Sequence, residues 1–264
     1  MGTEHVAIDW ERGLERMKAY KSLAWTESLL ALPGDYEEEV RQYTGIINKQ
    51  TNHKAKSMLH LGCGAGGHDR FLKADFDITG VDLNEEMLTL ARKANPKVTY
   101  LQGDMRSVRL DQQFDVVIVP DAIAYMNTEE DLEKALETAA AHLKTTGLFM
   151  VVTHTREEFR NNNFVYTGSD GQTHLTLFEN NHIIGENQYE ATMIYLIRQH
   201  GKLTVDHDVH SLGMFSHETW CRLLEKHGLK IKETFNMDQL YDEYVMKDGE
   251  YRLKVYLCEK EPNT

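Results

Sequence analysis

Short apolar runs alternate with amphipathic stretches through the first half of the chain. The runs have the length of buried strands, and the stretches between them repeat apolar residues every three or four positions, as amphipathic helices do. Strands that alternate with helices in this way are joined by crossovers and form a parallel sheet. The predicted strands are Met58–Leu61, Ile78–Val81, Val98–Leu101, Val116–Val119 and Leu148–Val152, with helices over residues 36–47, Met87–Ala94 and Leu132–Leu143.

The two ends of the chain carry different patterns. Helical spacing over residues 5–31, stopped by Pro33 and Gly34, predicts one N-terminal helix. After Phe159, strand-like runs separated by turn residues predict an inserted antiparallel meander. Ser216 is a typical N-cap of a further helix, which Gly228 ends. The strands expected in this half are Thr173–Phe178, Tyr189–Arg198, Lys202–Leu212, Leu229–Phe235 and Leu253–Cys258.

The order of these elements predicts an α/β fold. We expect a Rossmann-like, seven-stranded, mostly parallel sheet with helices on both faces, plus the antiparallel strand meander as an insertion. A chain of 264 residues can bury such a core without disulfides or metals. The expected parts are an N-terminal lid helix (1–34), an α/β core (35–158), an inserted antiparallel cap (159–213) and a C-terminal completion of the core sheet (214–264).

The charge and the cysteines restrict the partners. With 29 Lys and Arg against 42 Asp and Glu, the net charge of −13 repels phosphate backbones, so we expect no nucleic acid. No apolar run approaches the ~18 residues that span a bilayer, and the N-terminus lacks the pattern of a secretory leader, which predicts a cytoplasmic protein without a membrane partner. Three separated cysteines predict reduced thiols. His207 and His210 would point to opposite faces of a strand, so no metal site is expected.

A glycine-rich turn follows the first strand of the core. Gly62, Gly64 and Gly67 match the spacing G-x-G-x-x-G, in which glycine lets the backbone turn sharply and a ligand approach it closely. This spacing alone leaves a nicotinamide or flavin nucleotide open. Asp82 ends the second strand about twenty residues on, where a carboxylate can accept both hydroxyls of an adenosine ribose. The two motifs together predict a nucleoside cofactor.

The end of the third strand favours one kind of nucleoside cofactor. Gly103, Asp104 and Met105 place an acid where the exocyclic amine of adenine can donate to it, and an apolar side chain where the purine face can lie. The three strand ends together resemble the class I S-adenosylmethionine-dependent methyltransferases, and this resemblance makes residues 35–158 the cofactor-binding part. The remaining positions expected at the cofactor are Leu61, Cys63, Leu83, Met87 and Pro120.

A narrower resemblance is carried by Gly103–Arg106, Gln113–Asp115, Ile123–Met126 and a His-rich strand before the Ser216 helix. These segments are similar to bacterial N-methyltransferases of nucleotide-linked amino sugars. The resemblance implies an N-terminal aromatic residue that closes over the cofactor, with Trp25 as the best match and Tyr20 as the second. The chain departs from the family pattern in two loops, which carry Asp121-Ala122-Ile123-Ala124 and Val152-Thr153-His154-Thr155.

The expected reaction moves a methyl group from S-adenosylmethionine to a small polar metabolite, with an amine nitrogen of an amino-sugar-like acceptor as the specific prediction. A sulfonium is already a good leaving group, so positioning and exclusion of water supply most of the rate, and a base is optional. The candidate catalytic residues are Tyr125, Asp121, His154 and His210. Alternatives that stay open are an O-methyltransferase of a small acid or hydroxyl, an RNA or protein methyltransferase, a non-catalytic cofactor-binding subunit and a nicotinamide enzyme. The inserted strands are expected either to cover the acceptor pocket or to form a homodimer.

Overall fold

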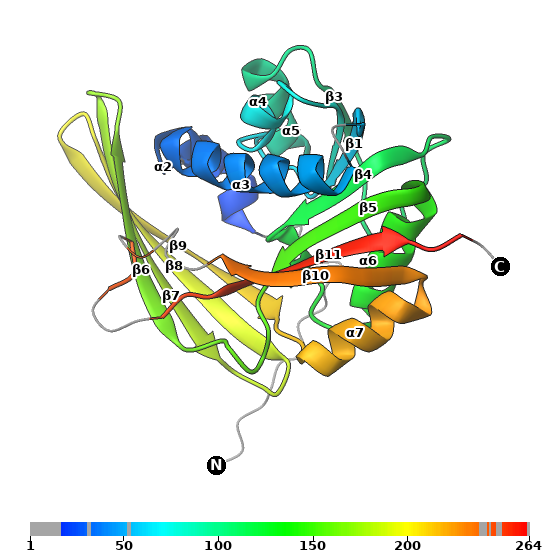
Figure 1. The fold of residues 1–264 in the computed structure, drawn as a ribbon. Helices are drawn as coiled ribbons and strands as arrows, with labels where there is room; N and C mark the ends of the chain where they lie inside the picture. The colour runs from blue at the N-terminus through cyan, green and yellow to red at the C-terminus, as the bar shows by residue number, and fades with distance from the viewer. Residues whose placement is uncertain are drawn as a thin grey trace.

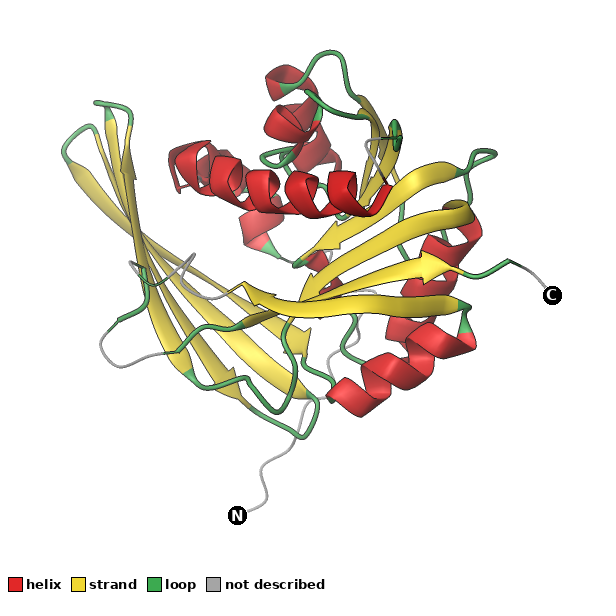
Figure 2. Cartoon of the chain, viewed as in Figure 1, coloured by secondary structure: helices red, strands yellow, loops and turns green. Residues whose placement is uncertain are grey.

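Two β-sheets lie side by side in the computed structural model, and short N-terminal elements and one long helix lie between them (Figure 1). The structure describes residues 17–30, 33–51, 54–237, 242, 244–246 and 250–262. Figure 2 shows that the helices gather around the larger sheet, whereas the smaller sheet carries none on its outer side in this view. The larger sheet therefore forms the body of the protein, and the smaller sheet stands beside it.

The larger sheet has seven strands in the order β10-β11-β5-β4-β1-β2-β3. The five strands from the first half of the chain are parallel, because each returns by a crossover, and β11 pairs antiparallel with both β5 and β10. The strands are β1 (Ser57–Leu61), β2 (Asp77–Asp82), β3 (Thr99–Gln102), β4 (Phe114–Pro120), β5 (Leu143–Thr153), β10 (Leu229–Met237) and β11 (Leu253–Lys260).

Helices cover both faces of this sheet. Tyr43 and Ile47 of α3 pack on one face, whereas Leu136 and Trp220 pack on the other, and all four side chains are buried. The predicted α/β architecture with a seven-stranded, mostly parallel sheet is confirmed. The helices around the sheet are α3 (Pro33–Thr51), α4 (Asp69–Leu72), α5 (Glu85–Ala94), α6 (Glu129–His142) and α7 (His217–Lys226).

The smaller sheet is an antiparallel meander in the order β6-β7-β8-β9. The predicted insertion is confirmed, but its first strand was not predicted, because Asn162, Asn163 and Gly168 are residues typical of loops. The strand forms nonetheless, because the side-chain amide of Asn181 on β7 donates a hydrogen bond to the side-chain oxygen of Asn162. Gly168 has no side chain and so leaves room for the backbone of Leu29. The strands are β6 (Asn162–Ser169), β7 (Thr173–Ile183), β8 (Gln188–Gln199) and β9 (Lys202–Gly213).

The N-terminal segment differs from the single helix predicted over residues 5–31. Residues 1–16 lie outside the described part, and residues 17–30 form two 3₁₀ turns, η1 (Lys18–Tyr20) and η2 (Ala24–Thr26), followed by the short helix α2 (Glu27–Leu30). Contacts with the smaller sheet override the helical spacing. Two carboxylates of β9 hold η1, and Leu23 packs into the core of the smaller sheet.

Three further observations concern membranes, thiols and metals. Within the described ranges, no helix combines the length and the apolar character needed to cross a bilayer. Cys63, Cys221 and Cys258 are free thiols. His207 is exposed and His210 is buried, on opposite faces of β9 as predicted, and no group of three or more metal-ligating side chains occurs among the residues that the structure describes.

Candidate active site

The glycine-rich turn after β1 adopts a backbone that only glycine takes without strain. Gly62, Gly64 and Gly66 have φ values of +72°, +52° and +75°. A Cβ atom on Gly62 would lie 2.3 Å from the Cβ of Ala122, in the loop that follows β4. The sequence pattern of glycines is therefore a steric requirement of the place where the ends of β1 and β4 meet.

Asp82 ties the end of β2 to this turn. Its Oδ2 accepts a hydrogen bond from the backbone N–H of Gly64 at 2.8 Å, and its Oδ1 accepts one from Asn84 at 2.9 Å. Burial raises the pKa of the Asp82 carboxyl, and the two N–H donors act in the opposite direction. Each carboxylate oxygen keeps a second lone pair, so Asp82 can still accept the two hydroxyls of a ribose.

Asp104, two residues after β3, already accepts several hydrogen bonds from within the protein, which the sequence did not indicate. The backbone N–H of Arg106 and three contacts from its guanidinium reach the two carboxylate oxygens, the shortest at 2.6 Å. Burial by itself raises the pKa of Asp104, but these hydrogen bonds outweigh it and leave the pKa below its usual value. Asp104 therefore has little accepting capacity left for the amine of an adenine unless Arg106 moves.

These strand ends surround a cavity of about 280 Å³. Most of the predicted cofactor residues line it, but Leu61 and Trp25 do not. Leu61 is fully buried inside the core, and Trp25 is 37% exposed, because its neighbours Ala24 and Thr26 are the residues that η2 turns inward. The predicted residues that line this cofactor cavity are Tyr20, Gly62, Cys63, Gly64, Asp82, Leu83, Met87, Gly103, Asp104, Met105 and Pro120.

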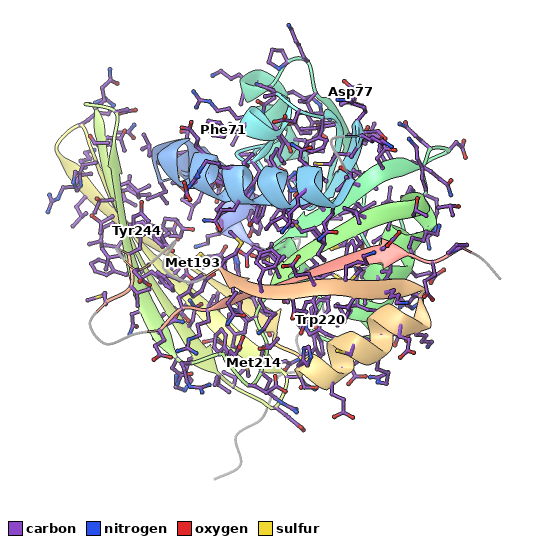
Figure 3. All side chains as sticks on the ribbon, viewed as in Figure 1. Phe71, Asp77, Met193, Met214, Trp220 and Tyr244 are labelled. Carbon is purple, nitrogen blue, oxygen red and sulfur yellow. The ribbon has the colours of Figure 1, made fainter. Side chains whose placement is uncertain are left out.

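A second cavity of about 330 Å³ lies between the body and the smaller sheet and adjoins the first. All four predicted catalytic residues line this second cavity, which we name the acceptor cavity after that prediction, and Tyr125 and Asp121 line both cavities. In Figure 3, the labelled Met193 and Tyr244, which also line it, lie toward the smaller sheet. The structure thus brings together four candidates that the sequence places on three separate segments.

Asp121 lies at the junction of the two cavities. Its φ of +59° is unusual for a residue other than glycine and costs on the order of 1–3 kcal/mol, which the surrounding structure must sustain. Burial raises the pKa of the Asp121 carboxyl, the nearby His154 opposes this, and the carboxylate of Glu39 raises the pKa further. The strained backbone therefore holds an acid at the junction of the two cavities.

His154, just after β5, is a buried neutral imidazole. Its Nδ1 contacts the carbonyl oxygen of Arg252 at 3.0 Å, so the Nδ1–H donates and the lone pair resides on Nε2. Burial lowers the pKa of His154, although the nearby Asp121 carboxylate opposes this. Rings of Phe159 and Tyr251 enclose it at centroid distances of 5.2 and 4.9 Å. A neutral imidazole with a free lone pair can accept a proton.

Tyr125 and His210, the two remaining catalytic candidates, contact each other. Its hydroxyl lies 2.8 Å from Nδ1 of His210 and is also hydrogen-bonded to the hydroxyl of Tyr20. Burial raises the pKa of both phenols, so they remain protonated. Tyr20, the weaker sequence candidate, is therefore the aromatic residue that stands at the junction of the two cavities, whereas Trp25 stands outside them.

Sequence reasoning missed several acids of the acceptor cavity. Glu27, Glu39 and Glu179 line it together with Asp121, and no lysine or arginine is found among its described lining residues. Burial raises the pKa of Glu27 and Glu179. The sequence does contain a signal for Glu179, because this acid follows Leu175 and Leu177 in the alternating series of inward-facing residues on β7. Tyrosines complete the lining: Tyr20, Tyr36, Tyr125, Tyr166, Tyr189, Tyr195, Tyr244 and Tyr251.

Comparisons with known proteins relate this chain to methyltransferases. Residues 58–147 match the family model described as a methyltransferase domain. A dTDP-3-amino-3,4,6-trideoxy-alpha-D-glucopyranose N,N-dimethyltransferase of Streptomyces venezuelae is 37% identical over 44% of this chain and 50% of its own length, so the chain spans about half of that relative. A dTDP-3-amino-3,6-dideoxy-alpha-D-glucopyranose N,N-dimethyltransferase of Streptomyces fradiae is 28% identical over 75% of this chain and 79% of its own. The crystal structure of Streptomyces venezuelae DesVI superposes with a TM-score of 0.73 at 26% identity, over 84% of this chain and 91% of the other.

The sheet order and the cofactor cavity agree with the methyltransferase domain that residues 58–147 match. The match agrees with the class and the cofactor predicted from the three strand ends. The similarity to amino-sugar N-methyltransferases, which the sequence motifs indicated, is confirmed as well.

Proposed function

We propose that this protein transfers a methyl group from S-adenosylmethionine to the amine nitrogen of a small, amino-sugar-like metabolite. The observation that carries the proposal is the acceptor cavity, whose described lining has four carboxylic acids and eight tyrosines but no lysine or arginine. Such a lining attracts an ammonium group and offers many hydrogen bonds to hydroxyl groups. The activities for which the two relatives are named, both on amino sugars, support the same acceptor class.

The residues have separate tasks in this proposal. Asp82, the glycine turn and the apolar Leu83, Met87 and Met105 hold the adenosyl part of the donor. S-adenosylmethionine supplies a methyl group that is already activated on a sulfonium. Asp121 orients the acceptor amine by its negative charge.

Proton removal falls to His154 in this proposal. Its Nε2 lone pair takes the proton that an ammonium must lose before it becomes a nucleophile. The smaller sheet covers the acceptor and keeps water out.

The charge of the acceptor cavity separates this proposal from its alternatives. A carboxylate acceptor would face Glu27, Glu39, Asp121 and Glu179, with no lysine or arginine among the described lining residues to offset the repulsion. An RNA phosphate backbone would meet the same repulsion, together with the net charge of −13. A hydroxyl acceptor is compatible with the charge but gains nothing from it, so the amine is the best-supported acceptor.

The reaction is tested by offering the enzyme S-adenosylmethionine with matched acceptors. These are dTDP-3-amino-3,6-dideoxyglucose, the same compound with a hydroxyl in place of the amine, and a small dicarboxylate. We expect S-adenosylhomocysteine to accumulate with the amino sugar only, and mass spectrometry to place the added methyl on nitrogen. Methylation of the hydroxyl or carboxylate compound in its place would contradict the proposal.

We also propose that the outer face of the smaller sheet joins two copies of the chain. Phe178, Ile194, Val205 and Val209 are between 39% and 61% exposed on this face, and its central rows carry no charged side chain. Ile194→Lys is expected to convert a dimer to a monomer in light-scattering measurements. The control is Leu101→Lys, an equally exposed apolar position on β3 that should leave the mass unchanged. A wild-type monomer would refute the proposal.

A further inference from the structure

A chain of four polar side chains runs from β9 through the body of the protein to the N-terminal segment. Oδ2 of Asp208 lies 3.0 Å from Nε2 of His210, whose Nδ1 lies 2.8 Å from the hydroxyl of Tyr125. The hydroxyl of Tyr125 is in turn bonded to that of Tyr20. Asp208 and His210 are 8% and 2% exposed, so water does not compete for these bonds. This hydrogen-bond chain therefore links the carboxylate of Asp208, which lines neither cavity, to the hydroxyl of Tyr20, which lines both.

The direction of every bond in this chain follows from its first member. An ionised Asp208 can only accept, and the hydrogen bonds from His210 and Ala19 leave its pKa below the usual value even though burial raises it. In the neutral imidazole of His210, Nε2 then carries the hydrogen and the lone pair is left on Nδ1. Tyr125 donates to that lone pair, and Tyr20 donates to the oxygen of Tyr125.

The fixed direction of these bonds determines what Tyr20, the last member of the hydrogen-bond chain, can offer to a ligand. Because the hydrogen of Tyr20 is committed to Tyr125, the Tyr20 hydroxyl can act only as an acceptor toward a bound ligand. A protonated or neutral amine has hydrogens to donate, so an acceptor at this position holds its nitrogen in place. With the opposite tautomer of His210, the bond to Asp208 would be lost, both hydrogen bonds of the Tyr125 hydroxyl would reverse, and Tyr20 would present a hydrogen to the amine instead.

We propose that Asp208 is a positioning residue that fixes the direction of this hydrogen-bond chain, so that Tyr20 presents an oxygen acceptor to the methyl-accepting amine. The proposal rests on the proposed amine methyltransferase function. Asp208 touches neither ligand and acts through His210 and Tyr125. Its role resembles that of a buried carboxylate that selects one histidine tautomer in a hydrolase, where loss of the carboxylate disables correctly placed groups.

The tautomer of His210 can be observed directly, without any methyl acceptor. In ¹⁵N-histidine-labelled protein, two-bond ¹⁵N–¹H spectra should show hydrogen on Nε2 in the wild type and on Nδ1 in Asp208→Ala, with the signals assigned through His210→Gln. Asp208→Ala should also lower kcat for the amino sugar by about tenfold or more, with KM for S-adenosylmethionine within about twofold. Asp208→Asn retains an oxygen that can accept from Nε2, and it should restore both the tautomer and most of kcat.

Asp206 provides a matched control on the same strand. Its Oδ1 is 2.5 Å from Nζ of Lys18, so it holds the same N-terminal turn as Asp208 without contacting His210. Asp206→Ala should leave the tautomer and kcat close to wild type.

If Asp206→Ala and Asp208→Ala lowered kcat equally, Asp208 would only anchor the N-terminal turn, and the inference would be wrong. An unchanged His210 tautomer in Asp208→Ala would also overturn it. A wild-type enzyme that methylates no amine would refute the proposed function instead, so the two failures are distinguishable.

Discussion

Asp82→Ala is expected to weaken the binding of S-adenosylmethionine by about 2–3 kcal/mol, or roughly 30- to 140-fold in Kd. The variant removes both oxygens that would accept the ribose hydroxyls. It also leaves the backbone N–H groups of Gly64 and Asn84 without their acceptor, so the glycine turn loses the bond that ties it to β2. Isothermal titration with S-adenosylmethionine and S-adenosylhomocysteine measures the effect on both ligands.

Two comparison variants sharpen this measurement. Asp77 lies exposed at the other end of the same strand and is labelled in Figure 3, so Asp77→Ala should leave the Kd unchanged. Asp104→Ala should weaken binding less than Asp82→Ala, because Arg106 already occupies the Asp104 oxygens. Binding by Asp82→Ala that equals the wild type would show that the nucleoside does not lie against the end of β2.

The cofactor side of the site could be predicted because its signals are local. A buried parallel strand is a continuous apolar run, and the residue that follows it lies at the carboxyl edge of the sheet, where ligands bind in this architecture. Gly62 comes directly after such a run and Asp82 ends the next strand, whereas Asp104 lies two residues after the short and mostly exposed β3. The parallel order of β1, β2 and β3 brings the three residues together. Knowledge of the strands was sufficient to locate the cavity.

The acceptor side could be predicted only in part, because its residues meet through contacts distant in sequence. Tyr20 and Trp25 are both aromatic residues near the N-terminus, and nothing local shows that Tyr20 reaches the cavities while Trp25 turns outward. Asp208 and Glu179 face inward only once the register of the meander is known, since a shift of one residue exchanges the faces of a strand. The pairing of the inserted strands therefore holds the missing information.

Asp121→Asn is expected to reduce kcat/KM for the amino sugar by about 100-fold and to change the Kd of S-adenosylmethionine by less than about threefold. Asparagine preserves the size of the side chain and tolerates positive φ better than most residues, so the loop after β4 keeps its shape. What is lost is a negative charge beside the nitrogen, on which positive charge develops during methyl transfer. Steady-state kinetics, together with titration of the cofactor, separate the two quantities.

The pair of measurements also decides what Asp121 contacts, because it lines both cavities. If its carboxylate bound the amino group of the donor instead, Asp121→Asn would raise the Kd of S-adenosylmethionine about tenfold or more and leave the acceptor KM unchanged. Glu86→Gln, an exposed position on α5, removes the same unit of charge from the protein and should alter neither value. A loss confined to the acceptor would place the methylated amine against Asp121, because a donor that contacted the same carboxylate would lose affinity as well.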